Sequence, residues 1–277
     1  MNHNQVIDFL PERAADAHKG TCGKILLLCG SRGYTGAAAL AAMGALRTGS
    51  GLVYLAVPES IYMIEAVKLT EPVVMPLPDH NGMYAPSATA ELLQMLDKMD
   101  AVLVGPGIGQ SDGSLAVVKT VLTSFSGPVV IDADGINVLQ MHKDLLRERT
   151  CPTILTPHIG EFLRIGGQIK ENRIASAADL AADLGAIILL KGHNTVITDG
   201  THCYVNPTGN PGLATGGSGD VLAGIITALL GFMIPPLEAA ACGAWLHGAA
   251  GDICADEIGQ YGMLPTDLLN VLPRLLK

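Results

Sequence analysis

Short apolar runs alternate with segments of helical patterning along most of this chain. Six runs of strand length are hydrophobic almost throughout, and they span 24–30, 51–57, 100–105, 128–133, 152–157 and 186–192. Helical patterning lies between them, around 36–48, 87–98, 113–124 and 174–184. A strand that is apolar throughout is buried on both faces. The alternation therefore predicts an α/β fold, in which a mostly parallel, doubly wound sheet is covered by helices on both faces.

The C-terminal part of the chain has a different pattern. Residues 195–206 predict a hairpin around Asp199-Gly200, and the sequence after Gly217 predicts helices with breaks at 235–236 and near Pro265. The apolar run at 221–234 falls short of the ~20 residues of a bilayer span, so we expect a buried helix there. No linker, repeat or low-complexity tract interrupts the sequence, which predicts one domain over residues 1–277.

Composition narrows the range of partners. The chain carries a net charge of −9, which argues against nucleic acid or an anionic membrane surface as a partner. Anionic small ligands would have to be bound by loop amides and a few lysines. The six cysteines form no CxxC pair, which predicts reduced thiols in the core. Residues 1–20 do not have the pattern of a signal or transit peptide, which predicts a cytoplasmic location.

The segment from Asn206 to Asp220 contains five glycines and leads directly into an apolar helical run. Glycines allow positive φ angles and a close approach of the backbone to a ligand. Where such a loop opens a helix, free N–H groups and the helix dipole favour an anion such as phosphate. Asp220 beside that anion could accept a proton from a hydroxyl that attacks a phosphoryl group. The alternative is that Ser218 or Asp220 is an ordinary N-cap, but a cap alone requires neither the glycines nor the Asn-Pro turn.

Other polar or glycine-rich segments follow the predicted strands, where ligands bind in doubly wound sheets. The glycines at 30–36 and 105–109 could approach a ligand or simply allow close helix packing. Asp132 ends the strand at 128–133 and Asp134 directly follows it. Carboxylates there could bind Mg²⁺ through water or bond a ribose, although Asp134-Gly135 is also a common turn. Lys191 could reach a phosphate, or it could be a solvated lysine at a strand end.

His158 and Glu161 lie three residues apart at a predicted helix start. At this spacing both side chains face the same side and can contact a ligand or a hydrated metal ion. The alternative is that Glu161 only completes a capping arrangement.

Eight motifs together resemble the NAD(P)H-hydrate dehydratase family of the ribokinase-like superfamily. In chain order they are HKGTCGKILLLCGS, GPGIG, VVIDADGINVL, TILTPHIGEF, LLKGHNTVI, NPTGN, LATGGSGDVLAGII and WLHGAAGD. The resemblance implies a ribokinase-like fold and a lyase that repairs hydrated NADH and NADPH. The hydroxyl on C6 of the S epimer is phosphorylated and the phosphate is then eliminated, with ADP preferred over ATP and with Mg²⁺ as cofactor.

The resemblance also implies roles for individual residues. Asp220 matches the catalytic base and contacts the hydrate, whose pocket is lined by Ala37, Gly107 and His158. The nucleotide would be bound by two segments, Lys191, Gly192, His193, Asn194 and Thr195 in one and Gly216, Gly217, Ser218 and Gly219 in the other. Glu161 resembles the acidic member of the superfamily's metal motif and would act through water, although His158 stands where the kinases have Asn.

The resemblance further implies partners and alternatives. The family pattern begins by about residue 18, which predicts a stand-alone dehydratase that works with a separate NAD(P)H-hydrate epimerase. A homo-oligomer, as in the tetrameric relatives, is expected. The alternatives are a ribokinase-like kinase for a small molecule such as a vitamin precursor, and a nucleotide-sensing module without turnover.

Overall fold

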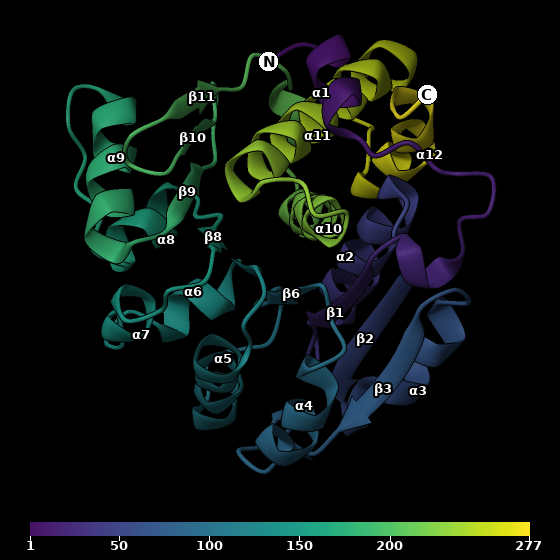
Figure 1. Cartoon of the computed structure of the whole chain (residues 1–277), viewed down its shortest axis with the longest axis vertical. Coiled ribbons are helices and arrows are strands. Elements are labelled where there is room, and N and C mark those ends of the chain that lie inside the picture. Colours follow the sequence, from purple (N-terminus) through teal and green to yellow (C-terminus); the bar gives the residue numbers. More distant parts are fainter.

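The computed structural model describes residues 1–277. It is built on a nine-stranded sheet, and Figure 1 shows helices on both sides of it. The strand order is β11-β10-β9-β8-β7-β6-β1-β2-β3. The strands are β1 (Lys24–Leu28), β2 (Leu52–Pro58), β3 (Val73–Leu77), β6 (Ala101–Val104), β7 (Val129–Ile131), β8 (Thr153–Leu155), β9 (Ile187–Leu190), β10 (Val196–Thr198) and β11 (Cys203–Val205). All neighbours pair in parallel except at β10, which is antiparallel to both β9 and β11. The predicted parallel sheet and the hairpin at 195–206 are confirmed.

Each buried strand contributes side chains to two separate cores. In β1, Ile25 and Leu27 belong to one core, whereas Leu26 and Leu28 belong to the other, as alternation along a strand requires. The first core packs under α1 (His3–Phe9), α2 (Thr35–Thr48), α3 (Glu59–Lys68), α10 (Ser218–Gly231), α11 (Pro236–Ile258) and α12 (Pro265–Leu275). The second packs under α4 (Ala88–Leu96), α5 (Asp112–Ser124), α6 (Asp134–Val138), α7 (Asp144–Arg147), α8 (Ile159–Arg164) and α9 (Arg173–Leu184). The expected helix layers on both faces are present.

Several elements were not expected from the sequence. The strand β3 and the helix α3 lie where no pattern was assigned, and β4 (Asp79–His80) pairs with β5 (Met83–Tyr84) in a separate hairpin. The turn of this hairpin has positive φ at Asn81 and Gly82, which is the Asn-Gly signature of a two-residue turn. Arg32 donates its backbone N–H to the Gly82 carbonyl at 2.8 Å. The hairpin therefore packs against the loop that follows β1.

The predicted core positions of the cysteines are only partly correct. Cys29, Cys242 and Cys254 are buried, whereas Cys203 on the edge strand β11 is exposed, and all six cysteines are free. Cys203 thus lies on the outermost strand of the sheet and outside both cores. No helix of this structure combines the length and apolarity that crossing a membrane requires.

Helix α10 packs closely on α2 because glycines lie at the contact. A Cβ added at Gly224 would overlap the Ala41 carbonyl oxygen, and one added at Gly44 would lie 2.7 Å from the Val221 carbonyl oxygen. The backbones of the two helices therefore lie too close together at Gly224 and at Gly44 for a side chain at either position. This contact fixes α10 against the sheet, and the glycine loop that precedes α10 is fixed with it.

Gly224→Ala is therefore expected to destabilise the fold. Overpacking costs about 1–3 kcal/mol or more and the gain in helix propensity returns only about 1 kcal/mol, so we expect a net loss of about 2 kcal/mol. Gly36→Ala is the control, because no atom lies within 4 Å of an added Cβ there. Urea unfolding of both variants measures the difference, and a Gly224→Ala variant as stable as wild type would show that the helices separate without cost.

Candidate active site

The sheet changes direction of winding between β1 and β6, and two glycine loops meet there. The Gly30 N–H donates to the Pro106 carbonyl at 2.7 Å, and the Ser31 hydroxyl donates to the Gly107 carbonyl at 2.6 Å. Gly107 has φ 64, and an added Cβ would lie 3.0 Å from the Ala37 Cβ. The structure thus brings together Ala37 and Gly107, two residues expected to line the hydrate pocket, at the switch point where ligands bind such sheets.

Next along the sheet, the ends of β7, β8 and β9 carry a buried polar cluster. Asp132 is 1% exposed, and its Oδ1 accepts from Lys191 Nζ and from the Thr156 hydroxyl, both at 2.7 Å. Lys191 Nζ lies 3.9 Å from Glu161 Oε2. Burial alone would lower the pKa of Lys191, but the charges of Asp132, Glu161 and Asp220 raise it above its ordinary value. Lys191 is therefore a partly buried, charged ammonium that is paired with Asp132 rather than a freely solvated lysine.

The glycine loop places the start of α10 beside this cluster. The N-cap of α10 is Gly217 at φ 95, and no side chain caps the helix, so the interpretation of Ser218 or Asp220 as an N-cap is wrong. A Cβ added at Gly219 would lie 3.4 Å from Lys191 Nζ and 3.8 Å from Asp132 Oδ2. The uncapped N–H groups of a 14-residue helix and one ammonium thus converge on the same place, which suits an anion.

Asp220 lies in the first turn of α10. Burial, together with the negative charge of Asp132, raises its pKa from 3.8 to about 7, although Lys191 opposes the shift. The carboxylate does not cap the helix, and no hydrogen bond contributes to the shift of its pKa. A carboxyl group with a pKa near neutrality is suited to accept and release a proton, so the geometry fits the role of a base.

His158 and Glu161 form a capping box at the start of α8. The Gly160 and Glu161 N–H groups donate to His158 Nδ1, and the His158 N–H donates to Glu161 Oε2 at 2.9 Å. Glu161 therefore completes a cap, as one of the two interpretations expects, and it also lies beside Lys191 in the polar cluster. Because Nδ1 accepts, the proton of a neutral His158 lies on Nε2, and this atom lies 3.3 Å from Glu161 Oε1. The cap orients the imidazole toward the cavity that it lines.

A cavity of about 930 Å³ lies between the end of β9 and the start of α10. Eight of the predicted site residues line it, namely His158, Lys191, Gly192, His193, Asn194, Thr195, Ser218 and Gly219. The loop at 191–195 is closed on itself, because the Thr195 hydroxyl donates to the Gly192 carbonyl at 2.8 Å. The volume suits a nucleotide-sized ligand. Ala37, Gly107, Glu161, Gly216, Gly217 and Asp220 do not line this cavity.

The opposite wall of the cavity includes residues to which no role had been assigned. Asn206, Thr208, Asn210 and His247 line it. The loop is fixed by α11, since Asp252 accepts from the Gly209 N–H at 2.9 Å and from the Asn210 amide at 3.0 Å. The WLHGAAGD motif, which contains both His247 and Asp252, was the available signal.

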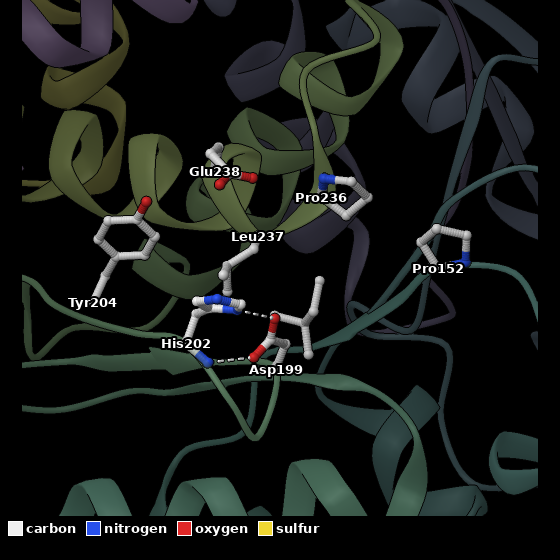
Figure 2. Close-up of a pocket in the computed structure, with 8 residues that line it drawn as sticks. Pro152, Asp199, His202, Tyr204, Pro236, Leu237 and Glu238 are labelled. Carbon is white, nitrogen blue, oxygen red and sulfur yellow. Dashed lines mark hydrogen bonds and ion pairs between the residues drawn. The ribbon is translucent and has the colours of Figure 1, made fainter.

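A smaller cavity of about 370 Å³ lies elsewhere, at the amino-terminal ends of the strands. Figure 2 shows hydrogen bonds between Asp199 and His202 at the hairpin turn, and Tyr204 and Glu238 also line this cavity. His202 is largely exposed, with 74% of its side chain accessible. Because no residue of the polar cluster reaches this cavity, we regard the larger one as the candidate site.

Comparisons with known proteins agree with this geometry. Residues 25–274 match the family described as NAD(P)H-hydrate dehydratase. The ADP-dependent (S)-NAD(P)H-hydrate dehydratase of Bacillus subtilis is 37% identical over 275 residues, which is 97% of this chain and 94% of that protein. A crystal structure of the Bacillus subtilis ADP/ATP-dependent NAD(P)H-hydrate dehydratase, co-crystallised with ATP/Mg²⁺, superposes with a TM-score of 0.85 at 34% identity, covering 99% of this chain and 96% of that one.

Two further matches define the limits of the comparison. The bifunctional NAD(P)H-hydrate repair enzyme of Moorella thermoacetica is 45% identical over 97% of this chain, but the chain spans only 52% of that protein. Arabidopsis thaliana ribokinase, at 13% identity with a TM-score of 0.60 over 92% of this chain and 99% of that one, shares the fold alone. The expected ribokinase-like fold is confirmed.

The raised pKa of Asp220 makes a prediction about stability. Because its pKa is higher in the folded protein than in the unfolded chain, ionisation favours unfolding, and stability falls as the pH rises from about 4 through about 7. The Asp220→Asn variant does not undergo this loss. The free energy of unfolding of the variant minus that of wild type should therefore increase by about 1–2 kcal/mol between about pH 5 and about pH 8. Urea unfolding at a series of pH values measures it. A difference that does not change with pH would mean that Asp220 is solvated.

Proposed function

Because this chain belongs to the NAD(P)H-hydrate dehydratase family, we propose that it converts the S hydrates of NADH and NADPH back to NADH and NADPH, using ADP. The observation that carries the proposal is Asp220, a carboxyl group with a pKa of about 7 at the uncapped start of α10. A base at that place is next to an anion site and can take a proton from a hydroxyl that attacks a phosphate.

The proposed reaction has two steps. The C6 hydroxyl oxygen of the hydrate attacks the terminal phosphorus of ADP, its proton passes to Asp220, and AMP leaves. The C6–O bond of the phosphorylated hydrate then breaks, because the lone pair of the ring nitrogen displaces phosphate, and loss of a proton from the adjacent carbon restores the dihydropyridine ring. The products are NAD(P)H, inorganic phosphate and AMP.

Each part of the site has a task in this proposal. The backbone N–H groups of Gly216 to Gly219 hold the phosphoryl group as it transfers, and Lys191 adds a positive charge beside them. The loop from Gly192 to Thr195 binds the adenine nucleotide. Ala37, Gly107 and His158 line the hydrate pocket, which brings the hydroxyl to Asp220.

We propose Mg²⁺ as the cofactor. No three His, Cys, Asp or Glu side chains are grouped to hold a metal ion, and both Glu161 oxygens already interact with His158. This donor set fits an ion that keeps its waters and binds the phosphates, with Glu161 interacting through water. Such an ion would neutralise charge on the nucleotide.

We propose ADP as the preferred nucleotide, because the close relatives of similar length are named ADP-dependent. An S-specific enzyme cannot use the R epimer, so a separate NAD(P)H-hydrate epimerase is the expected partner. A cytoplasmic location would fit a substrate derived from NADH and NADPH.

We further propose one domain over residues 1–277, because one nine-stranded sheet takes its strands from Lys24 to Val205. A homo-oligomer, with a tetramer as the proposed state, is supported by Met63, Ile64 and Val67, which are exposed on one side of α3. When copies of a chain assemble, exposed apolar side chains that share one face can be buried between them.

A turnover assay tests the proposal. The purified protein is incubated with each hydrate epimer and either ADP or ATP, and the near-ultraviolet absorbance of the restored dihydropyridine is followed. We expect turnover of the S hydrate with ADP, a slower rate with ATP, none with the R hydrate, and loss of activity in excess EDTA. A stable phosphorylated product without recovery of absorbance would identify a small-molecule kinase, and ADP binding without phosphate release would identify a nucleotide sensor.

Asp220→Asn tests the proposed base. The amide keeps the size of the side chain but cannot accept the proton, so the turnover number should fall roughly 10²–10⁴-fold. ADP binding should change little, and near neutral pH the variant should unfold at a temperature no lower than that of wild type. In wild type, kcat/KM should rise with pH around an apparent pKa of about 7. A variant with near-normal turnover would remove Asp220 from the mechanism.

A further inference from the structure

His247 is a buried polar side chain that the proposed mechanism does not use. It lies on α11, and 9% of the residue is exposed. Its Nε2 atom lies 2.9 Å from the Ser218 carbonyl oxygen and 3.0 Å from the Ser218 hydroxyl oxygen. His247 and Ser218 both line the 930 Å³ cavity. One ring nitrogen thus contacts both the carbonyl and the hydroxyl oxygen of Ser218.

These contacts determine which ring nitrogen carries the proton. A carbonyl oxygen only accepts hydrogen bonds, so Nε2 must carry a hydrogen and donate it to the Ser218 carbonyl. Burial lowers the pKa of His247 to about 4, so the ring is neutral near pH 7 with its single proton on Nε2. A protonated Nε2 cannot accept a hydrogen bond from the Ser218 hydroxyl. The hydroxyl hydrogen is therefore free to point elsewhere.

The position of Ser218 limits where that hydrogen can point. Ser218 is the first residue of α10, follows Gly217 directly and is 5% exposed. Its side chain borders the cavity at the place where the helix N–H groups face a prospective anion. A phosphoryl oxygen in the cavity is a natural acceptor for this hydrogen, in addition to the backbone donors.

We infer that His247 is a positioning residue, which holds Ser218 through its carbonyl and keeps the Ser218 hydroxyl available as a donor to the terminal phosphate of ADP. The inference rests on the proposed function. Without His247, the serine hydroxyl can turn toward a carbonyl of its own backbone, as serine side chains near helices commonly do. The phosphate would then lose one donor although Ser218 is still present.

A double-mutant cycle tests the inference. Ser218→Ala removes the hydroxyl, and His247→Leu removes the group that positions it. Each single variant is expected to lower kcat roughly 10–10²-fold, as the loss of one donor to a developing charge does, while the double variant is no slower than the slower single one. His247→Gln can donate from a similar position and should keep kcat within about threefold of wild type.

A control separates positioning from packing. Leu246 is fully buried on the same helix, and Leu246→Val should lower the Tm without changing kcat. The inference is overturned if the two losses multiply in the double variant, if His247→Leu keeps the wild-type kcat, or if kcat falls in Leu246→Val in proportion to Tm.

Calorimetric titration of the same four proteins of the cycle with ADP and Mg²⁺, without hydrate, separates this inference from the proposed function. The single variants should each weaken ADP binding roughly 3–10-fold, and the double variant no further. If wild type binds ADP but does not dehydrate the hydrate, the proposed function fails, and the ADP cycle still decides the role of His247. If the losses of ADP affinity in Ser218→Ala and His247→Leu multiply in the double variant, the positioning role of His247 is contradicted.

Discussion

The ion pair between Lys191 and Asp132 is the interaction on which the site depends. It joins the ends of β9 and β7 at 2.7 Å with Asp132 almost completely buried, and Thr156 on the loop after β8 completes the hydrogen bonds of the carboxylate. A buried pair of this kind keeps its charges only where such partners are present. Because Asp132 holds Lys191, the ammonium is directed at the start of α10, while Asp220 has no comparable partner and its pKa rises.

The arrangement explains how an acidic chain could bind the anionic nucleotide that we propose as its co-substrate. The net charge is −9, so the whole-protein field opposes a nucleotide, and attraction must come from groups within a few ångströms. Lys191 and the uncapped start of α10 are the groups that would provide it. The close packing of Gly224 and Gly44 at the α10–α2 contact holds those N–H groups in place, so core packing and ligand binding are coupled.

The sequence predicted what depends on local patterning. The continuous apolar runs predicted the parallel strands, and the glycines before Asp220 predicted an anion site at a helix start. The ion pair between Asp132 and Lys191 could not be predicted, because these residues are far apart in the chain and meet only through strand order. His247 was missed for the same reason, since its contact with Ser218 depends on how α11 packs on α10. Glu161 served both as a cap and as a member of the polar cluster, and the spacing alone could not separate these roles.

The central claim is that the hydroxyl of the hydrate is phosphorylated before it leaves. The most direct measurement follows its oxygen atom. The hydrate is prepared in water enriched in the heavy oxygen isotope, so that the C6 hydroxyl carries the label, and it is then converted with ADP in ordinary water. If the hydroxyl attacks phosphorus as proposed, mass spectrometry will find the label in inorganic phosphate. Label released into water, with unlabelled phosphate, would contradict the mechanism and the role of Asp220 in it.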